Sequence, residues 1–262
     1  MLAKQQIQRS FNHFNPRNYL KDYYSYVEPD EIKTIAFEIE IFRVIHRLFG
    51  QVKILEYGSG PTHHHTIPLS PYVGEIDIAE YNPSNLIEVI EWVWNKPGTH
   101  PWSWVPFTRY ALQCEGVVEP TGLQIIAREQ MTRNKIRRFI QSDADFIDPR
   151  SNVFRAPYPV VTSWYCADSS TDDKEIWRSR MRNIVSLVAS GGIFVTAALR
   201  KAAAYKVGNM YFPSANIDEN DMTDVLTLDF DPQSIIVEVK DVPEHRVLGY
   251  EGIILAHARK QA

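Results

Sequence analysis

A glycine turn and a carboxylate further along the chain are the residues whose types and spacing could do chemistry. The turn, Gly58-Ser59-Gly60-Pro61-Thr62, directly follows an apolar run over 52–57. A glycine turn that closes a buried strand lets a ligand approach the backbone closely. Glu80 ends a second apolar stretch, and an acidic side chain about 20 residues after such a turn can accept hydrogen bonds from both hydroxyls of a ribose. The pair therefore predicts a site for an adenosine-containing ligand.

The turn does not continue into the full dinucleotide-binding fingerprint. Pro61 and Thr62 follow, and no third glycine comes at the expected place. A pyrophosphate ligand is therefore disfavoured. S-adenosylmethionine (SAM) has no phosphate, and it needs only a close backbone approach for its amino-acid end and a carboxylate for its ribose. The two features together favour a SAM-dependent methyltransferase.

A longer stretch near the start of the chain points to a particular family. Residues 13–24 read His-Phe-Asn-Pro-Arg-Asn-Tyr-Leu-Lys-Asp-Tyr-Tyr, which resembles the amino-terminal cap of the nicotinamide, phenylethanolamine and thioether or indolethylamine N-methyltransferase family. That family also carries Gly-Ser-Gly-Pro-Thr. Further matches follow in the same order: Glu80-Tyr81 with Asn85, Ser142-Asp143, Cys166 with Asp168, Gly191-Gly192, Gly208 with Phe212, Glu251-Gly252 and 258–260. The resemblance spans nearly the whole chain.

The resemblance implies a set of cofactor-binding residues. Tyr19 and Tyr24 would close over the cofactor or the acceptor, the glycine turn would hold the methionine end, and Glu80 would bind the ribose. Members of the family have aspartate at the position of Glu80, so the longer side chain should reach the hydroxyls from a different placement. The implied set, in which Asn85 and Asp143 bracket the adenine, is Tyr19, Tyr24, Gly58, Ser59, Gly60, Thr62, Glu80, Tyr81, Asn85, Asp143, the backbone amide of Ala144, and Trp164.

Several of these residues also have a purely structural interpretation. The two cap tyrosines could simply pack a helix, since tyrosine is amphipathic and often partly buried. Asp143 could be a turn or helix-cap residue, and Glu80 could be a solvated strand end. Trp164, with Tyr165, lies where the family has smaller side chains near the methionine moiety, so it could narrow the pocket or only pack in the core.

The acceptor site is less specified than the cofactor site. Asp168 follows the fourth expected strand, where the nicotinamide-methylating members have an aspartate near the acceptor; it could hold an amine, or it could cap the helix that starts near 171–173. The resemblance places Ser214 in the family's substrate lid and makes Tyr250 the polar position late in the sheet. The acidic pair of the phenylethanolamine type is not reproduced, which disfavours a catecholamine, although Asp168 and Glu251 could anchor a cation.

Three adjacent histidines, His63, His64 and His65, directly follow the turn. Neighbouring side chains of a regular element diverge, so the three cannot all face one metal ion, and no metal site is expected. His64 falls where the family has a pocket-lining tyrosine. An imidazole titrates close to neutral pH and could take a proton from an ammonium acceptor, which must be neutral to attack. A hydrogen-bonded structural histidine is the alternative.

Length, composition and net charge limit the class of protein. The chain has 262 residues, 44% of them hydrophobic, so we expect one domain over 1–262, with 1–50 as a cap and 51–262 as the core. A net charge of −4 gives no general attraction to nucleic acid. Two cysteines are too few for a disulfide framework, and no apolar segment reaches the roughly 20 residues that span a bilayer. We expect a cytoplasmic monomer or weak homodimer without membrane or nucleic-acid partners.

The order of apolar segments predicts an α/β fold, the Rossmann-like seven-stranded sheet of class I methyltransferases. A helix is predicted over 31–49, ending at Gly50. The last two strands should pair antiparallel, because the link between them has no room for a crossover helix. Residues 96–134, with several Pro and Trp, should form an irregular or small β insertion. Strands are predicted at 52–57, 74–80, 136–142, 158–165, 192–198, 234–241 and 249–258, and helices around 83–95, 172–189 and 218–227.

The leading functional hypothesis is SAM-dependent methylation of the nitrogen of a small amine, a guanidine-bearing metabolite or a nitrogen heterocycle. Catalysis would come mainly from proximity, because in-line displacement at a sulfonium needs alignment and exclusion of water. Asp168 or His64 would assist by orienting and deprotonating the acceptor. One alternative keeps the fold and methylates a thioether or hydroxyl. Another is a SAM-binding protein without transferase activity.

Overall fold

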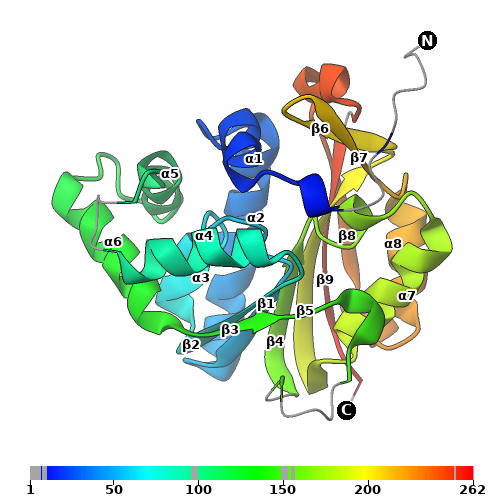
Figure 1. Ribbon diagram of the computed structural model, residues 1–262. Coiled ribbons are helices and arrows are strands. Elements are labelled where there is room, and N and C mark those ends of the chain that lie inside the picture. Colours follow the sequence, from blue (N-terminus) through cyan, green and yellow to red (C-terminus); the bar gives the residue numbers. More distant parts are fainter. Residues whose placement is uncertain are drawn as a thin grey trace.

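A seven-stranded, mostly parallel sheet forms the centre of the protein in a computed structural model that describes residues 7, 11–95, 100–148, 153–154, 157–250 and 252–261 (Figure 1). The strand order is β3-β2-β1-β4-β5-β9-β8. The first five of these strands run parallel, and β9 pairs antiparallel with both β5 and β8. The predicted strands, the closing hairpin and the fold class are confirmed. The strands are β1 Lys53–Tyr57, β2 Glu75–Glu80, β3 Ile136–Gln141, β4 Tyr158–Trp164, β5 Val188–Arg200, β8 Ile236–Asp241 and β9 Gly252–Arg259.

Helices cover both faces of the sheet (Figure 1). On one face, α7 (Lys174–Val185) and α8 (Glu219–Thr227) pack into a buried apolar cluster with the strands. On the other face lie α2 (Pro29–Phe49) and α4 (Pro83–Trp94), and α2 ends at Gly50 as predicted. Among the described residues, no helix combines the length and the apolar composition that crossing a bilayer requires.

The prediction of an irregular or small β insertion over 96–134 is wrong. Within the described part, 100–134, the chain forms α5 (Val105–Cys114) and most of α6 (Gly122–Lys135). Pro106 sits in the first turn of α5, where its missing N–H leaves no hydrogen bond unmade. A capping box between Thr121 and Gln124 starts α6. Trp104 is buried beside the cap and α3 (Thr66–Leu69), so the residue types that suggested irregular chain instead serve helix starts and packing.

A small hairpin that the sequence patterns did not predict meets the amino-terminal cap above the sheet. It consists of β6 (Ala204–Val207) and β7 (Met210–Pro213), and it lies beside α1 (Pro16–Tyr23) in Figure 1. Phe212 of β7 stacks on Phe11 at 5.4 Å between ring centroids, and the Tyr23 hydroxyl donates to the Lys206 carbonyl at 2.8 Å. Two segments far apart in sequence therefore cover the carboxyl ends of the parallel strands together.

Candidate active site

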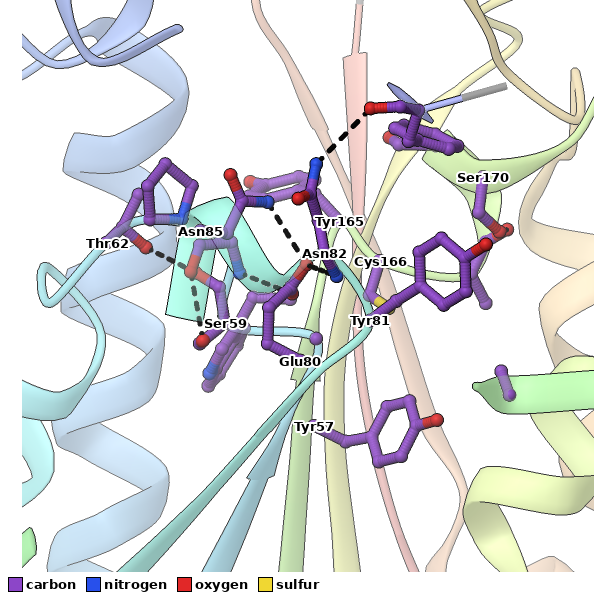
Figure 2. A pocket seen from close by; sticks show the side chains of 18 of the residues that line it. Tyr57, Ser59, Thr62, Glu80, Tyr81, Asn82, Asn85, Tyr165, Cys166 and Ser170 are labelled. Carbon is purple, nitrogen blue, oxygen red and sulfur yellow. Dashed lines mark hydrogen bonds between the residues drawn. The ribbon is translucent and has the colours of Figure 1, made fainter. Parts of the chain in front are cut away.

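The main cavity lies at the carboxyl ends of the parallel strands. The strand order reverses between β1 and β4, and ligands of open α/β sheets bind in the crevice at such a point. The cavity has a volume of about 310 Å³, within the range of about 300–1,000 Å³ that is typical of small-molecule sites. Residues at the ends of β1, β2, β3 and β4 line it, among them Tyr57 and Glu80 (Figure 2). Phe14, Tyr19 and Tyr24 of the cap line it as well.

The conformation of the turn requires glycine at Gly58. Gly58 has a φ of +77°, and a Cβ on it would lie 2.0 Å from the Cys166 Sγ. Its N–H donates to the Ala79 carbonyl at 2.7 Å, which ties the turn to the end of β2. Gly60 also has a positive φ, of +58°. The turn therefore exposes backbone, rather than side chains, to the cavity.

The Glu80 carboxylate connects the turn to the start of α4, as Figure 2 shows. Its Oε2 accepts from the Gly60 N–H at 3.0 Å, and its Oε1 accepts from the Asn82 N–H at 2.9 Å and the Asn85 Nδ2 at 3.0 Å. Glu80 is only 7% exposed, so the interpretation as a solvated strand end is wrong. Burial raises its pKa. Each carboxylate oxygen has two lone pairs, so the three accepted hydrogen bonds leave one lone pair, on Oε2, for a ribose hydroxyl.

The residues expected around the adenine all line the cavity. The Asn85 Oδ1 is buried and has no hydrogen-bond partner within the protein. Asp143 accepts from the Asp145 N–H at 2.9 Å, so the expected turn-capping role is real, and Asp143 lines the cavity as well. Ala144 follows it in the cavity wall, and Tyr81, 51% exposed, stands at the edge. Their contacts with adenine stay a prediction.

The two cap tyrosines both pack and face the cavity. Their hydroxyls lie 3.1 Å apart, and the Tyr24 ring is 4.4 Å from the His64 ring between centroids. Burial raises the pKa of both phenols, so they stay neutral at physiological pH. Trp164 is 5% exposed and stacks on His65, and it also lines the cavity; it therefore narrows the pocket and packs in the core at once.

Asp168 does not line the main cavity. Its Oδ2 accepts from the Leu199 N–H at 2.9 Å, and burial raises its pKa to about 6. The helix-capping alternative for Asp168 is wrong, because Asp173 caps α7. Ser214 is 2% exposed with an unpartnered hydroxyl, and it also lies outside the cavity lining. The substrate roles of Asp168 and Ser214 therefore stay predictions, and Glu251 lies outside the described residues.

A smaller cavity of about 40 Å³ adjoins the main one and shares Tyr19 and Tyr24 with it. Tyr250 lines it, and its hydroxyl donates to the Asp30 Oδ2 at 2.7 Å. Tyr165, which has a strained φ of +49°, lines both cavities. Sequence reasoning missed the remaining side chains here because no motif marks them. These are Tyr23, Glu28, Asp30, Glu31, Ser169, Leu199, Tyr205 and His245.

The three histidines point in two directions. His63 turns away from the cavity, with its Nε2 3.1 Å from the Val89 carbonyl oxygen. His64 and His65 lie in a turn before α3 rather than in a regular element, and their ring centroids are 3.9 Å apart. Both face Glu31 of α2, whereas His63 faces away, so the three histidines do not share one site, as expected, but two of them lie together.

The fold and the cavity define a class I SAM-dependent methyltransferase. The N-methyltransferase NodS from Bradyrhizobium japonicum, solved with S-adenosyl-L-homocysteine, has a similar fold, with a TM-score of 0.54 at 14% identity over 95% of this chain and 100% of that one. The magnesium protoporphyrin IX methyltransferase from Synechocystis PCC 6803 gives a TM-score of 0.57 at 11% identity, over 95% and 96% of the two chains. These likenesses concern the fold.

The chain belongs to the NNMT/PNMT/TEMT family, whose sequence profile matches residues 3–261. It is 26% identical over 208 residues to nicotinamide N-methyltransferase of Homo sapiens, covering 78% of this chain and 76% of that protein. It is 24% identical over 232 residues to indolethylamine N-methyltransferase of Oryctolagus cuniculus, with coverages of 86% and 85%. With phenylethanolamine N-methyltransferase of Macaca mulatta it shares 22% over 269 residues, with coverages of 97% and 91%. The resemblance found in the cap and the turn is confirmed.

The cofactor of this enzyme is SAM, and the residues present fit it. Gly58 leaves no room for a side chain where the backbone must be approached, and the Glu80 Oε2 keeps one free lone pair. The buried Asn85 Oδ1 has no hydrogen-bond partner among the described residues, so it is available to accept a hydrogen bond from the cofactor. When bound, SAM supplies an electrophilic methyl group on a sulfonium.

Proposed function

We propose that this methyltransferase acts on the nitrogen of a small amine, a guanidine-bearing metabolite or a nitrogen heterocycle, and that the acceptor nitrogen reaches the main cavity from the smaller one. The observation that carries the proposal is the composition of the smaller cavity. Six tyrosines surround it, together with the side chains of Glu28, Asp30 and Glu31. Aromatic faces and carboxylates are the groups that attract an organic cation.

The charge at Asp30 supports a cationic acceptor. Burial raises the pKa of Asp30, but hydrogen bonds from His245 and Tyr250 outweigh this effect and hold the pKa below its usual value. Asp30 is therefore a carboxylate at neutral pH, and its His245 and Tyr250 contacts hold it at the cavity wall. An ammonium or guanidinium group would be attracted there before it is deprotonated for attack.

The surrounding residues have separable tasks in this proposal. Tyr19 and Tyr24 cover the site and exclude water, which favours in-line transfer between aligned groups. His64, which lines the main cavity 3.3 Å from the Glu31 Oε1, is the candidate to accept the proton that an ammonium acceptor loses. Asp168 remains a candidate for orienting the acceptor, through the Leu199 backbone that it holds.

We also infer that the protein works in the cytoplasm, as a single domain and as a monomer or weak homodimer. Both cysteines are free, which suits a reducing compartment. The net charge of −4 gives no reason to expect a nucleic-acid partner.

The test is transfer of a labelled methyl group from SAM to pools of small amines, guanidines, pyridines and thioethers, with mass spectrometry of the products. Label on nitrogen is the expected result, and Asp30→Asn should raise KM for cationic acceptors more than for neutral pyridines. Label on sulfur or oxygen alone would assign the thioether or hydroxyl alternative. SAM binding without product from any pool would contradict the proposal in favour of a non-catalytic SAM-binding protein.

A further inference from the structure

A second group of side chains beside the cofactor cavity has the composition of a metal site. Glu31 comes from α2, and His64 and His65 come from the turn after Gly60. Each offers one ligand atom, and these atoms all lie within 4.8 Å of one another. The three side chains are 5%, 2% and 3% exposed. Their proximity depends on the packing of α2 against the turn.

A further carboxylate orients one of the imidazoles. The Glu38 Oε2 lies 3.1 Å from the His65 Nδ1. In the tautomer that carries the proton on Nδ1, the Nε2 lone pair is free to bind an ion. That Nε2 lies 3.9 Å from the Glu31 Oε2. A carboxylate on the far nitrogen of a histidine is the usual support of a metal-binding imidazole.

The polar atoms of the cluster lack partners within the described part of the protein. The His65 Nε2, the Glu31 Oε2 and both nitrogens of His64 are buried without a hydrogen bond. Orphaned buried groups are unfavourable and call for an explanation. A proton shared between His64 and Glu31 would account for their 3.3 Å contact. It would leave the His65 Nε2 and the Glu31 Oε2 unpaired, whereas one cation at the centre would bind both of these atoms together with one nitrogen of His64.

We propose that Glu31, His64 and His65 bind one divalent transition-metal ion, with Zn²⁺ as the best match. Two imidazoles and one carboxylate form the donor set of open, three-ligand zinc sites, whereas Mg²⁺ and Ca²⁺ prefer oxygen ligands alone. His64 and His65 line the main cavity, so the remaining coordination position faces the space where cofactor and acceptor meet. Water or a Lewis-basic group of the acceptor would occupy it.

This inference goes beyond the proposed function and does not depend on it. When the ion is bound, the His64 Nε2 is a ligand and no longer accepts a proton from the acceptor. Methyl transfer by protein stripped of metal and binding of Zn²⁺ by the same protein are therefore separate measurements, and either can fail alone.

The chain supplies matched controls for the histidine ligands. His63 is the neighbour of the proposed ligands and is equally buried, but its two nitrogens already face the Thr66 hydroxyl and the Val89 carbonyl. His100 belongs to the other group among the described residues that could hold an ion, with Glu88 and Glu91. Loss of His63 or His100 should leave the proposed site intact.

The experiment is calorimetric titration of Zn²⁺ into full-length protein that has been stripped with a chelator and dialysed. We expect one tightly bound ion in the wild type and in the His63→Asn and His100→Asn variants, and no specific binding after His64→Asn or His65→Asn. Glu38→Gln should weaken binding about 10- to 100-fold, the usual effect of removing such a support. Circular dichroism establishes that each variant is folded.

X-ray absorption of the Zn²⁺-loaded wild type tests the ligand assignment even if a variant does not fold. Two imidazole ligands are expected in its spectrum. Absence of specific Zn²⁺ binding by the wild type, an all-oxygen shell, retained affinity in folded His64 and His65 variants, or loss of the site in His100→Asn would each overturn the assignment.

Discussion

Replacing Glu80 by glutamine tests the connection between the glycine turn and the ribose site. The carboxylate accepts three hydrogen bonds, from the Gly60 N–H on one oxygen and from Asn82 and Asn85 on the other. Glutamine offers one accepting oxygen and one NH₂ group. If the oxygen stays with Asn82 and Asn85, the NH₂ group faces the Gly60 N–H, and two donors oppose each other.

The size of the effect on SAM affinity follows from the hydrogen bond that the carboxylate would accept from the ribose. A hydrogen bond to a charged group contributes about 1.5–3 kcal/mol, so we expect SAM affinity to fall about 10- to 150-fold. Because the Gly60 N–H belongs to the turn, the stability of the free protein should also decrease, by about 1–3 kcal/mol for an orphaned buried donor. Burial raises the pKa of Glu80. The wild type should therefore lose affinity for SAM as pH falls and the Glu80 carboxylate is protonated. The difference in SAM affinity between the wild type and Glu80→Gln should then become smaller.

The assay is titration calorimetry with SAM at several pH values, together with thermal unfolding. Glu75→Gln is the matched control, because Glu75 begins the same strand but is exposed. Its affinity and melting temperature should equal those of the wild type. Wild-type affinity in a stably folded Glu80→Gln protein would refute the ribose role of Glu80.

Three further substitutions test the turn, the buried aspartate and the smaller cavity. Gly58→Ala places a Cβ 2.0 Å from the Cys166 Sγ at a φ of +77°, so it should lose SAM binding and about 1–3 kcal/mol of stability; an unchanged melting temperature would contradict this. Burial raises the pKa of Asp168 from 3.8 to about 6, so the folded protein holds this proton more tightly than the unfolded chain does. The free energy of unfolding should therefore fall by about 3 kcal/mol as pH rises from about 4 to about 6. Asp168→Asn should remove that decline, and urea unfolding at both ends of the range shows whether the wild type and variant differ. Tyr250→Phe removes the hydroxyl that donates to Asp30, so it should lower stability by about 1.5–3 kcal/mol in denaturant unfolding, and a change below 0.5 kcal/mol would remove this contact from the account.

The sheet was predictable because its signals are local. The parallel strands β1, β2 and β4 are short runs that are buried on both faces, and such runs can be recognised without knowledge of their neighbours. The glycine turn was predictable for a similar reason, since a positive φ at Gly58 restricts the residue type directly. Glu80 follows at the end of the neighbouring strand, so its closeness to the turn is a consequence of parallel pairing between β1 and β2.

The parts that failed depend on contacts between distant segments. Pro106 and Trp104 suggest irregular chain when they are considered alone. In the structure Pro106 occupies the first turn of α5, and Trp104 packs against the cap and α3. The β6–β7 hairpin has only four residues in each strand, too few for a clear period, and it is held by the cap aromatics. Neither arrangement has a local signal strong enough to be recognised.

The sequence by itself determined the class of enzyme, the cofactor and the position of Glu80 beside the glycine turn, because these depend on short motifs and on their spacing along the chain. Only the tertiary structure decided which way the less constrained side chains point. Asp168 faces the Leu199 backbone instead of the cavity, whereas His64 and His65 converge with Glu31, a residue that no motif marked. A side chain's direction follows from the packing of separate elements around it, and residues more than thirty positions apart share no local pattern from which that packing can be inferred.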